Sequence, residues 1–244
     1  MLSIIIPTLN EENYLPVLLK SIKRQSFASS KGRATGEKDY EIIVADAGSK
    51  DKTLEIAKNY GCIIVPGGLP AKGRNNGAKA AKGDLLFFLD ADTVLPQNFL
   101  KENLQEFNDR KIDIASFCFE SYSKNKSFHI MLDFYNKMII TLEKTLPYSA
   151  IGILVKKKLF DKINGYNENL KLSEDHDLSR RAVKFGKFGI IRSSNILVSD
   201  RRFKQDGWFQ TSMKYFLSEM HNFFIGPIKS DIFKYKFNHY KNKK

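Results

Sequence analysis

The sequence predicts an α/β fold, with a mainly parallel central sheet that helices flank. Three observations predict it. Short apolar stretches alternate with segments of helical periodicity along residues 1–95. These stretches are apolar nearly throughout, as parallel strands covered on both faces are. A length of 244 residues is also enough to bury one large core.

The first half of the chain should form four strands and the helices between them. Runs of apolar, often β-branched residues predict strands at 2–6, 41–45, 62–65 and 84–89. Apolar residues recur at three- and four-residue spacing in the predicted helices, 15–22, 49–60 and 71–81. Ser49 is expected to cap the second helix and Gly61 to end it, while Gly83 closes the third. Residues 26–38, rich in Ser, Gly and Lys, should form a surface loop.

The pattern is looser after residue 95. It predicts strands at 112–119 and 149–155 and helices at 127–146 and 173–185. No internal repeat or linker is visible, so we expect one domain, residues 1–199, and an extension, residues 200–244. The extension should contain a helix that packs on the core, on a membrane surface or on a partner. Its apolar stripe would be Trp208, Met213, Phe216, Leu217, Met220, Phe223 and Phe224.

The charge balance is strongly basic. Lys and Arg number 40 against 27 Asp and Glu, a net charge of +13, and 42% of the residues are hydrophobic. These values exclude an acidic disordered protein and a membrane-embedded one. Residues 229–244 interleave six lysines with aromatic residues. Such an end fits an anionic membrane surface or single-stranded nucleic acid, and it also fits a solvated end whose aromatic residues pack on the domain.

Cysteine use and the apolar segments indicate a compartment. Cys62 and Cys118 lie in apolar runs, which predicts buried thiols in a reducing environment. Residues 130–142 and 215–228 are interrupted by polar and charged residues and are shorter than the ~20 residues of a membrane span. The first residues show no basic leader or cleavage site. We therefore expect a cytoplasmic enzyme, with peripheral contact to the inner face of the cell membrane through the extension.

Acidic residues follow three of the predicted strands. They are Glu11 after the first strand, Asp46 after the second, and Asp90 and Asp92 after the fourth. Ligands of such sheets bind outside the carboxyl ends of the strands, so these carboxylates should meet at one edge. Asp90 and Asp92, one residue apart, would suit Mg²⁺ or Mn²⁺. The alternative is a turn in which both aspartates cap a helix that begins near Pro96.

Two further segments carry charges at predicted helix starts. Lys72 and Arg74 lie where free backbone N–H groups favour anions, and a diphosphate could bind between them and a metal ion. Glu174 and Asp175 open the helix at 173–185. Taken alone, these acids are best explained as a first helical turn that complements the helix dipole, with Ser173 as the cap.

Taken in order, these motifs resemble the family 2 glycosyltransferases, which have the GT-A fold. The resemblance covers about residues 2–192. It rests on five segments in the expected order, and the ordered set is specific although each segment is common. The segments are 5–12 (Ile-Ile-Pro-Thr-Leu-Asn-Glu-Glu), 43–53, the Gly-Arg-Asn-Asn-Gly run at 73–77, Asp-Ala-Asp at 90–92, and Glu174-Asp175 ahead of Leu178 and Arg181.

The resemblance implies a Rossmann-like nucleotide-binding half, residues 1–95, and an acceptor half, residues 96–199. It implies a nucleotide-sugar donor, with a UDP-sugar favoured over GDP-mannose, and a lipid-linked or saccharide acceptor. Asp92 would ligate the metal, Asp90 would contact the metal or the ribose, and Asp175 of the Glu174–Asp175 pair would be the general base. Arg201 and Arg202 could close over the donor diphosphate, because guanidinium pairs with phosphate. The donor-binding residues would be Pro7, Leu9, Glu11, Asp46, Lys72, Arg74, Asp90, Ala91, Asp92, Arg201 and Arg202.

The implied reaction is an inverting transfer. Negative charge develops on the diphosphate leaving group, and the metal with Lys72 and Arg74 would stabilise it. Asp175 would remove the proton from an attacking hydroxyl on the opposite face of the sugar. If the acceptor is an ionised phosphate, no base is needed and Asp175 would only position it.

Three other functions fit parts of the sequence. Residues 89–94 match the nucleophile motif of haloacid-dehalogenase-like phosphatases, with Asp90 as nucleophile and Asp92 as acid, although that motif usually opens its fold. A nucleotidyltransferase shares the nucleotide-binding architecture but has a glycine-rich basic loop that is absent after Ile6. A basic nucleic-acid-binding protein would explain the charge, but its phosphates would be repelled by the acids at the strand ends, so nucleic acid is not the expected partner.

Overall fold

A computed structural model describes residues 1–25, 39–170, 172–207 and several positions between 210 and 221. Those positions are 210, 211, 213, 214, 217, 218 and 221. Several predictions lie outside the described residues: the surface loop at 26–38, the basic end at 229–244, and part of the apolar stripe of the extension, including Trp208. The side chain of Arg202 is likewise outside the description.

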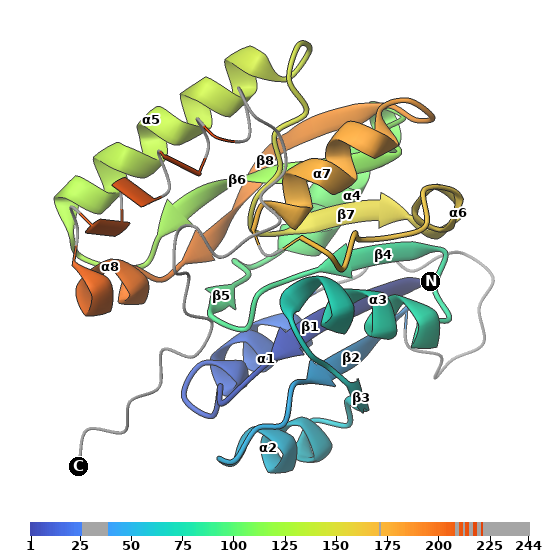
Figure 1. The fold of residues 1–244 in the computed structure, drawn as a ribbon, viewed down its shortest axis with the longest axis vertical. Helices are drawn as coiled ribbons and strands as arrows, with labels where there is room; N and C mark the ends of the chain where they lie inside the picture. The colour runs from blue at the N-terminus through green and yellow to red at the C-terminus, as the bar shows by residue number, and fades with distance from the viewer. Residues whose placement is uncertain are drawn as a thin grey trace.

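The described residues form one eight-stranded sheet covered by helices (Figure 1). The strands are β1 (Leu2–Thr8), β2 (Tyr40–Asp46), β3 (Ile63–Pro66), β4 (Leu85–Phe88), β5 (Thr93–Val94), β6 (Ile114–Ser121), β7 (Ile153–Lys156) and β8 (Phe188–Val198). The helices are α1 (Leu15–Lys23), α2 (Thr53–Asn59), α3 (Pro70–Ala80), α4 (Phe99–Asp109), α5 (Lys126–Leu142), α6 (Lys157–Lys162), α7 (Glu174–Ala182) and α8 (Arg201–Asp206). No helix in this part of the chain is long and apolar enough to cross a membrane.

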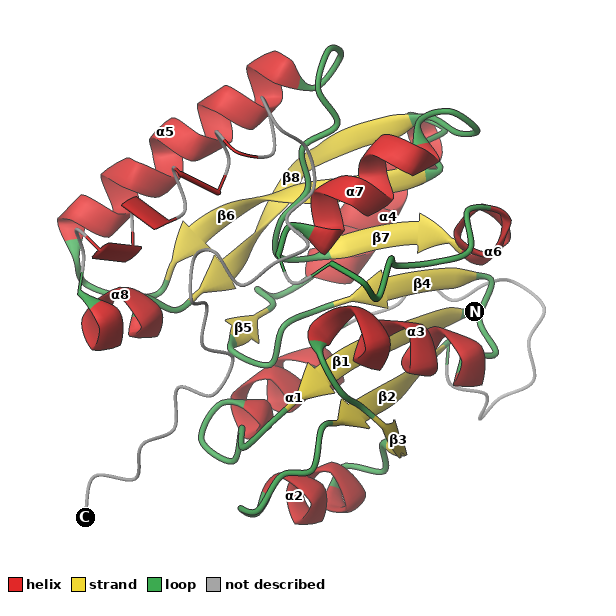
Figure 2. Ribbon diagram, viewed as in Figure 1, coloured by secondary structure: helices red, strands yellow, loops and turns green. Residues whose placement is uncertain are grey.

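The strand order is β3-β2-β1-β4-β7-β6-β8-β5. β1 to β4 are all parallel, and β6 pairs in parallel with β8. β7 runs antiparallel to β4 and β6, and the short β5 runs antiparallel to β8. The sheet is therefore mainly parallel in its first half and mixed in its second, as Figure 2 shows.

Both faces of the sheet are buried, as the apolar strands predict. Ile4 and Ile6 join a core with α1, α2 and α4, whereas Ile5 between them joins a core with α3, α6 and α7. The helix α3 approaches β1 very closely at Gly77. A Cβ atom at this position would lie 2.3 Å from Cγ2 of Ile5, so a larger residue would force the helix away from the sheet.

Two capping predictions are wrong. The helix α2 begins at Thr53 with Lys52 as its N-cap, and the hydroxyl of Ser49 instead hydrogen bonds to Asp46. The alternative in which Asp90 and Asp92 cap a helix is also wrong, because α4 has Asn98 as its N-cap. No range was predicted from the sequence for β5, α6 or β8. β5 and α6 are only two and six residues long, and such short elements carry too little periodicity to be found in this way. β8 has eleven residues, but the polar residues 192–195 divide its apolar run.

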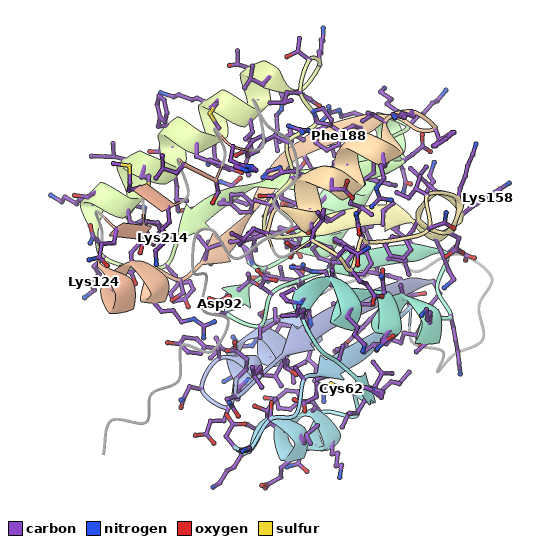
Figure 3. All side chains as sticks on the ribbon, viewed as in Figure 1. Cys62, Asp92, Lys124, Lys158, Phe188 and Lys214 are labelled. Carbon is purple, nitrogen blue, oxygen red and sulfur yellow. The ribbon has the colours of Figure 1, made fainter. Side chains whose placement is uncertain are left out.

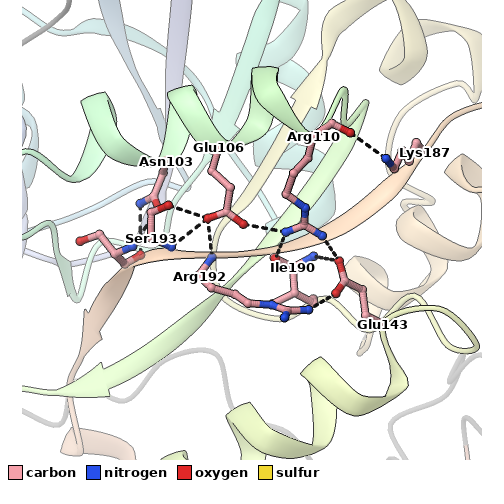
Figure 4. A network of polar contacts seen from close by, with 9 residues as sticks. Asn103, Glu106, Arg110, Glu143, Lys187, Ile190, Arg192 and Ser193 are labelled. Atoms are coloured by element: carbon pink, nitrogen blue, oxygen red, sulfur yellow. Dashed lines mark hydrogen bonds and ion pairs between the residues drawn. The ribbon is translucent and has the colours of Figure 1, made fainter.

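A polar network fixes α4 to β8 and to the segment after α5 (Figure 4). Glu106 accepts hydrogen bonds from the backbone N–H groups of Arg192 and Ser193 at 2.9 and 2.8 Å, and it pairs with Arg110 at 2.6 Å. Glu143 pairs with both Arg110 and Arg192. Burial alone would raise the pKa of Glu143, but the hydrogen bonds that it accepts, including one from Arg110, outweigh burial and lower it. The ionised carboxylate therefore stabilises the fold.

We expect Glu143→Gln to lower the free energy of unfolding by about 1–3 kcal/mol near neutral pH, because Arg110 and Arg192 both lose the charge of Glu143, although Arg110 keeps Glu106. A lowered pKa means that the stabilisation by Glu143 is present above its ordinary value of 4.5 and is lost as pH falls through the folded-state pKa. Urea unfolding should therefore show a difference between variant and wild type that shrinks in acid. Glu102→Gln, an exposed acid on α4, is the control. An equal difference at both pH values would contradict this role of Glu143.

Candidate functional site

The loop after β1 is held against the loop after β2 by backbone to side-chain hydrogen bonds. The N–H of Asn10 donates to Oγ of Ser49, and the N–H of Lys50 donates to Oδ1 of Asn10, both at 2.8 Å. The N–H of Glu11 donates to Oγ1 of the buried Thr53 at 2.7 Å. Glu11 is buried just beyond the carboxyl end of β1, and its position depends on both loops.

Asp46, at the end of β2, shapes the turn that follows it. Its carboxylate accepts hydrogen bonds from the N–H groups of Gly48 and Ser49, both at 2.9 Å, and from the hydroxyl of Thr8 at 3.2 Å. Gly48 has a φ of +93°, a conformation that glycine adopts without strain. Asp46 is thus connected through Ser49 to Asn10, in the loop that carries Glu11.

Asp90, Ala91 and Asp92 form a tight turn directly after β4. The backbone carbonyl of Asp90 accepts a hydrogen bond from the hydroxyl of Thr93 at 2.8 Å, and Ala91 is buried. The side chains of Asp90 and Asp92 keep 35% and 23% of their surface exposed. Both carboxylates can therefore be reached from solvent.

Arg201 joins two of these acidic segments. Its guanidinium forms a bidentate pair with Glu11 at 2.9 and 3.1 Å, and its Nε lies 3.1 Å from Oδ2 of Asp92. The same group lies over the ring of Tyr14, 4.4 Å from the ring centre. Arg201 begins α8, and the residue before it, Asp200, accepts a hydrogen bond from the hydroxyl of Ser123 at 2.6 Å. A residue 190 positions away in sequence from Glu11 thus connects the first and third acidic segments.

Arg74 joins Asp90 to the acidic pair at the start of α7. Its guanidinium nitrogens lie 2.9 Å from Asp90, 2.6 Å from Glu174 and 3.7 Å from Asp175. The side chain is 6% exposed and lies over the ring of Tyr166. From the sequence, Arg74 is expected to bind a diphosphate together with Lys72 and a metal ion. In the structure Arg74 is buried and lies beside three carboxylates.

The residue after Arg74 positions the approach to α7. The side-chain amide of Asn75 donates to the carbonyl of Tyr166 at 2.9 Å and to Glu168 at 2.8 Å, and it accepts from the N–H of Tyr166 at 2.9 Å. The segment that precedes α7 is thereby attached to α3. The Gly-Arg-Asn-Asn-Gly run therefore packs α3 on the sheet through Gly77 and holds the α7 region through Arg74 and Asn75.

Burial raises the pKa of Asp175 to about 7. Arg74 opposes this shift, while the negative charges of Glu174 and Asp90 add to it. The Asp175 carboxyl group is therefore partly protonated near neutral pH and can take up a proton there, which suits a general base. The N-cap of α7 is Ser173, as predicted, but its side chain makes no capping hydrogen bond.

The predicted site residues form two connected groups. Glu11, Asp92 and Arg201 make one group, and Arg74, Asp90, Glu174 and Asp175 make the other, with the 90–92 turn between them. Pro7 and Leu9 lie partly exposed at the end of β1, and Lys72 is exposed on α3. The sequence analysis missed Tyr14, Tyr166 and the role of Asp200. Tyr14 follows Asn10-Glu11-Glu12 closely enough to have been considered, but nothing local singles out Tyr166.

The chemistry of the site fits a hard divalent cation. Asp90 and Asp92 offer carboxylate oxygens that solvent can reach. No group of three His, Cys, Asp or Glu side chains suited to a metal occurs among the described residues. Mg²⁺ and Mn²⁺ bind well to one or two carboxylates when water and substrate phosphates complete the coordination. Asp90 and Asp92 could therefore hold Mg²⁺ or Mn²⁺ if water and substrate phosphates supply the remaining ligands.

The chain matches the model of one protein family and is similar to several glycosyltransferases. Residues 3–166 match the model of glycosyl transferase family 2. A glycosyltransferase of Haemophilus influenzae is 28% identical over 77% of this chain and 64% of its own length. The structure of Staphylococcus aureus TarS 1–349 in complex with UDP-GlcNAc is 21% identical, with a TM-score of 0.63 over 91% of this chain and 66% of that one.

The mannosyltransferase PcManGT from Pyrobaculum calidifontis, in complex with GDP-Man and Mn²⁺, has a TM-score of 0.69 at 18% identity. The alignment covers 88% of this chain and 61% of that one. The chain thus spans less than two thirds of the length of each of these three proteins. At such identities, the two structures show a shared fold.

We expect Arg74→Met to destabilise the protein by about 3–5 kcal/mol, because it leaves Asp90, Glu174 and Asp175 without their buried counter-charge. Arg74→Lys should lose less, since it keeps the charge but not the forked geometry. Urea unfolding at neutral pH measures both effects. Lys72→Met, an exposed cation on the same helix, should unfold like the wild type. Wild-type stability of Arg74→Met would show that the cluster does not need this cation.

Proposed function

The chain belongs to glycosyl transferase family 2 and has the GT-A fold, and we propose that it transfers one sugar from a nucleotide-sugar to a lipid-linked or saccharide acceptor. The observation that carries this proposal is the pair of arginine-linked carboxylate groups at the carboxyl ends of β1 and β4. Family membership supports a glycosyltransferase over a phosphatase or a nucleotidyltransferase. The donor that we favour is a UDP-sugar, with GDP-mannose second, and both nucleotides occur in complexes of the structural relatives.

In this proposal the donor binds to residues 1–95 and the acceptor to residues 96–199. Pro7, Leu9, Glu11 and Asp46 would contact the nucleoside. Pro7 and Asp46 lie at the carboxyl ends of the paired strands β1 and β2, and Leu9 and Glu11 follow β1. Arg201 has 14% of its side chain exposed and lies on Glu11 and Asp92. When the donor binds, the Arg201 guanidinium would leave these carboxylates and pair with the diphosphate, which can also accept two parallel hydrogen bonds.

Asp90 and Asp92 would hold the divalent cation. When bound, the cation would neutralise charge on the departing diphosphate. The exposed Lys72 near the start of α3 would add a positive charge on the same side. Arg74 would keep Asp90 and the α7 carboxylates in register and would not contact the donor, since it is already surrounded by its carboxylate partners.

Asp175 is the proposed base for a hydroxyl acceptor. The acceptor oxygen would bond to the anomeric carbon while its proton passes to Asp175 and the bond to the diphosphate oxygen breaks. A single displacement of this kind inverts the anomeric centre. Glu174, paired with Arg74 at 2.6 Å, would fix the orientation of α7. A phosphate acceptor would need no proton transfer, and Asp175 would then act only in positioning.

The extension at residues 200–244 suggests where the acceptor is found. Its basic and aromatic composition favours an anionic membrane surface. We include in the proposal a peripheral location on the cytoplasmic face of the membrane, where a lipid-linked acceptor would be available.

A melting-temperature screen of nucleotide-sugars with Mn²⁺ tests donor binding. The cognate donor at a hundredfold excess over its Kd should raise the midpoint by about 5–10 °C, because it binds only the folded state. Asp92→Ala should lose the metal-dependent part of this shift. Asp84→Ala, at the opposite end of β4, should keep all of it. Absence of a shift with any UDP- or GDP-sugar would reject the proposed donor class.

The pH dependence of transfer tests the base. With a hydroxyl acceptor, kcat/KM should rise with pH through about 7 and then level, because Asp175 accepts a proton only when ionised. Asp175→Asn should lower kcat by roughly 10²- to 10⁴-fold and keep the thermal shift from the donor. Retention of wild-type turnover in that variant would remove Asp175 from the chemistry, while loss of the donor shift would assign it a structural role.

A further inference from the structure

The outward side of α5 carries two exposed apolar side chains. Ile130 and Phe134, one helical turn apart, are 70% and 71% exposed, more than any other large apolar side chain in the described part of the chain. Lys126 precedes them by one turn and Lys137 follows in the next, and both are exposed. We refer to Lys126, Ile130, Phe134 and Lys137 as the α5 outer face.

This exposure is not needed to pack the helix. The opposite side of α5 already buries Phe128, Leu132 and Ile139 against the body of the protein. Single exposed apolar residues are ordinary on protein surfaces. Two large ones at i and i+4, with lysines on either side along the helix, form the pattern of a helix that lies in a membrane interface.

The charge around the α5 outer face favours an anionic surface. Lys124 precedes α5, and Lys214 of the extension lies at the same end of the molecule (Figure 3). Asp133 is an exposed acid next to the α5 outer face, and the lysines of the face and its surroundings outnumber it. The whole chain carries +13, which adds a long-range attraction to negatively charged lipids. Anionic lipid headgroups would pair with Lys126 and Lys137, and the bilayer interface would accept Ile130 and Phe134, whereas a neutral partner would leave both lysines unpaired.

The α5 outer face is structurally connected to the candidate site. The side chain of Asn125 caps α5, and Ser123 just before it donates a hydrogen bond to Asp200. The ring of Phe128 packs against that of Phe203 in α8, with 5.2 Å between ring centres. The start of α5 therefore lies against the helix that carries Arg201, the residue bound to Glu11 and Asp92.

We propose that the α5 outer face docks on an anionic lipid bilayer, with Ile130 and Phe134 at the headgroup level and Lys126 and Lys137 on lipid phosphates. This orientation would bring α8 and the adjoining carboxylate groups to the membrane surface, where a lipid-linked acceptor could enter. The entry of a lipid-linked acceptor rests on the proposed function. Binding of the α5 outer face to lipid is independent of that function. The surface differs from the basic end at 229–244, which could add to the same attraction.

The test is co-sedimentation of the full chain with vesicles. Binding should be stronger to phosphatidylcholine vesicles that contain phosphatidylglycerol than to pure phosphatidylcholine, and it should weaken with salt. Ile130→Ser with Phe134→Ser should weaken binding roughly tenfold or more, because the apolar insertion is lost. Lys126→Gln and Lys137→Gln should each weaken it about fivefold.

The matched control is Val183→Ser with Phe185→Ser. These two apolar side chains, at the end of α7 and just beyond it, are 38% and 55% exposed, and their replacement should leave vesicle binding unchanged. Every variant should keep its melting temperature and its donor-induced shift, which separates this proposal from the proposed function. Wild-type binding by the α5 variants, or equal loss in the control pair, would overturn the proposal. The proposal would also be overturned if the wild type formed a dimer and the α5 variants were monomers, because the α5 outer face would then bind a second copy of the chain.

Discussion

Concentrated negative charge at one edge of the sheet is the constraint on which the site depends. Asp90, Glu174 and Asp175 lie around a single guanidinium, that of Arg74, so this cluster has more negative than positive charge when all three carboxylates are ionised. Burial raises the pKa of Asp175 to about 7, and the negative charges of Glu174 and Asp90 add to this shift while Arg74 opposes it. A carboxyl group suited to accepting a proton thus results from burial next to other carboxylates.

The two arginines have different relations to solvent, and we infer different roles from this. Arg74 is enclosed among its three carboxylates and stabilises the contact between α3 and α7. Arg201 is somewhat more exposed and begins a short helix beyond the last strand of the sheet. Arg201 pairs with carboxylates of the proposed donor site, and a bound cation and diphosphate could take its place there. Displacement of Arg74 would leave Glu174 and Asp175 without a counter-charge, which costs far more free energy.

The mixed second half of the sheet brings these groups together. β7 pairs antiparallel with β4 and β6, so the segment after β7 can return over the α3 side of the sheet and deliver α7 to Arg74. β8 then runs parallel to β6 and ends beside β5, where Asp200 and Arg201 follow. The same end of the molecule carries the start of α5, so the proposed membrane surface and the proposed donor site share one structural support, α8.

Local patterns in the sequence determined the first four strands, the helices between them, and the acidic residues at the strand ends, because strand and helix periodicity act over a few residues. They also identified Glu11, Asp46, Asp90 and Asp92, since the topology of a parallel sheet places such residues at one edge. Glu174 and Asp175 were assigned to the site only by the resemblance to family 2 glycosyltransferases. Only the tertiary structure decided that Arg74 is buried among carboxylates, that Arg201 bridges Glu11 and Asp92, and that Ile130 and Phe134 face solvent. Arg74 and Glu174 are 100 residues apart, and Glu11 and Arg201 are 190. The burial and charge partners of these residues depend on contacts between distant segments, which no local pattern encodes.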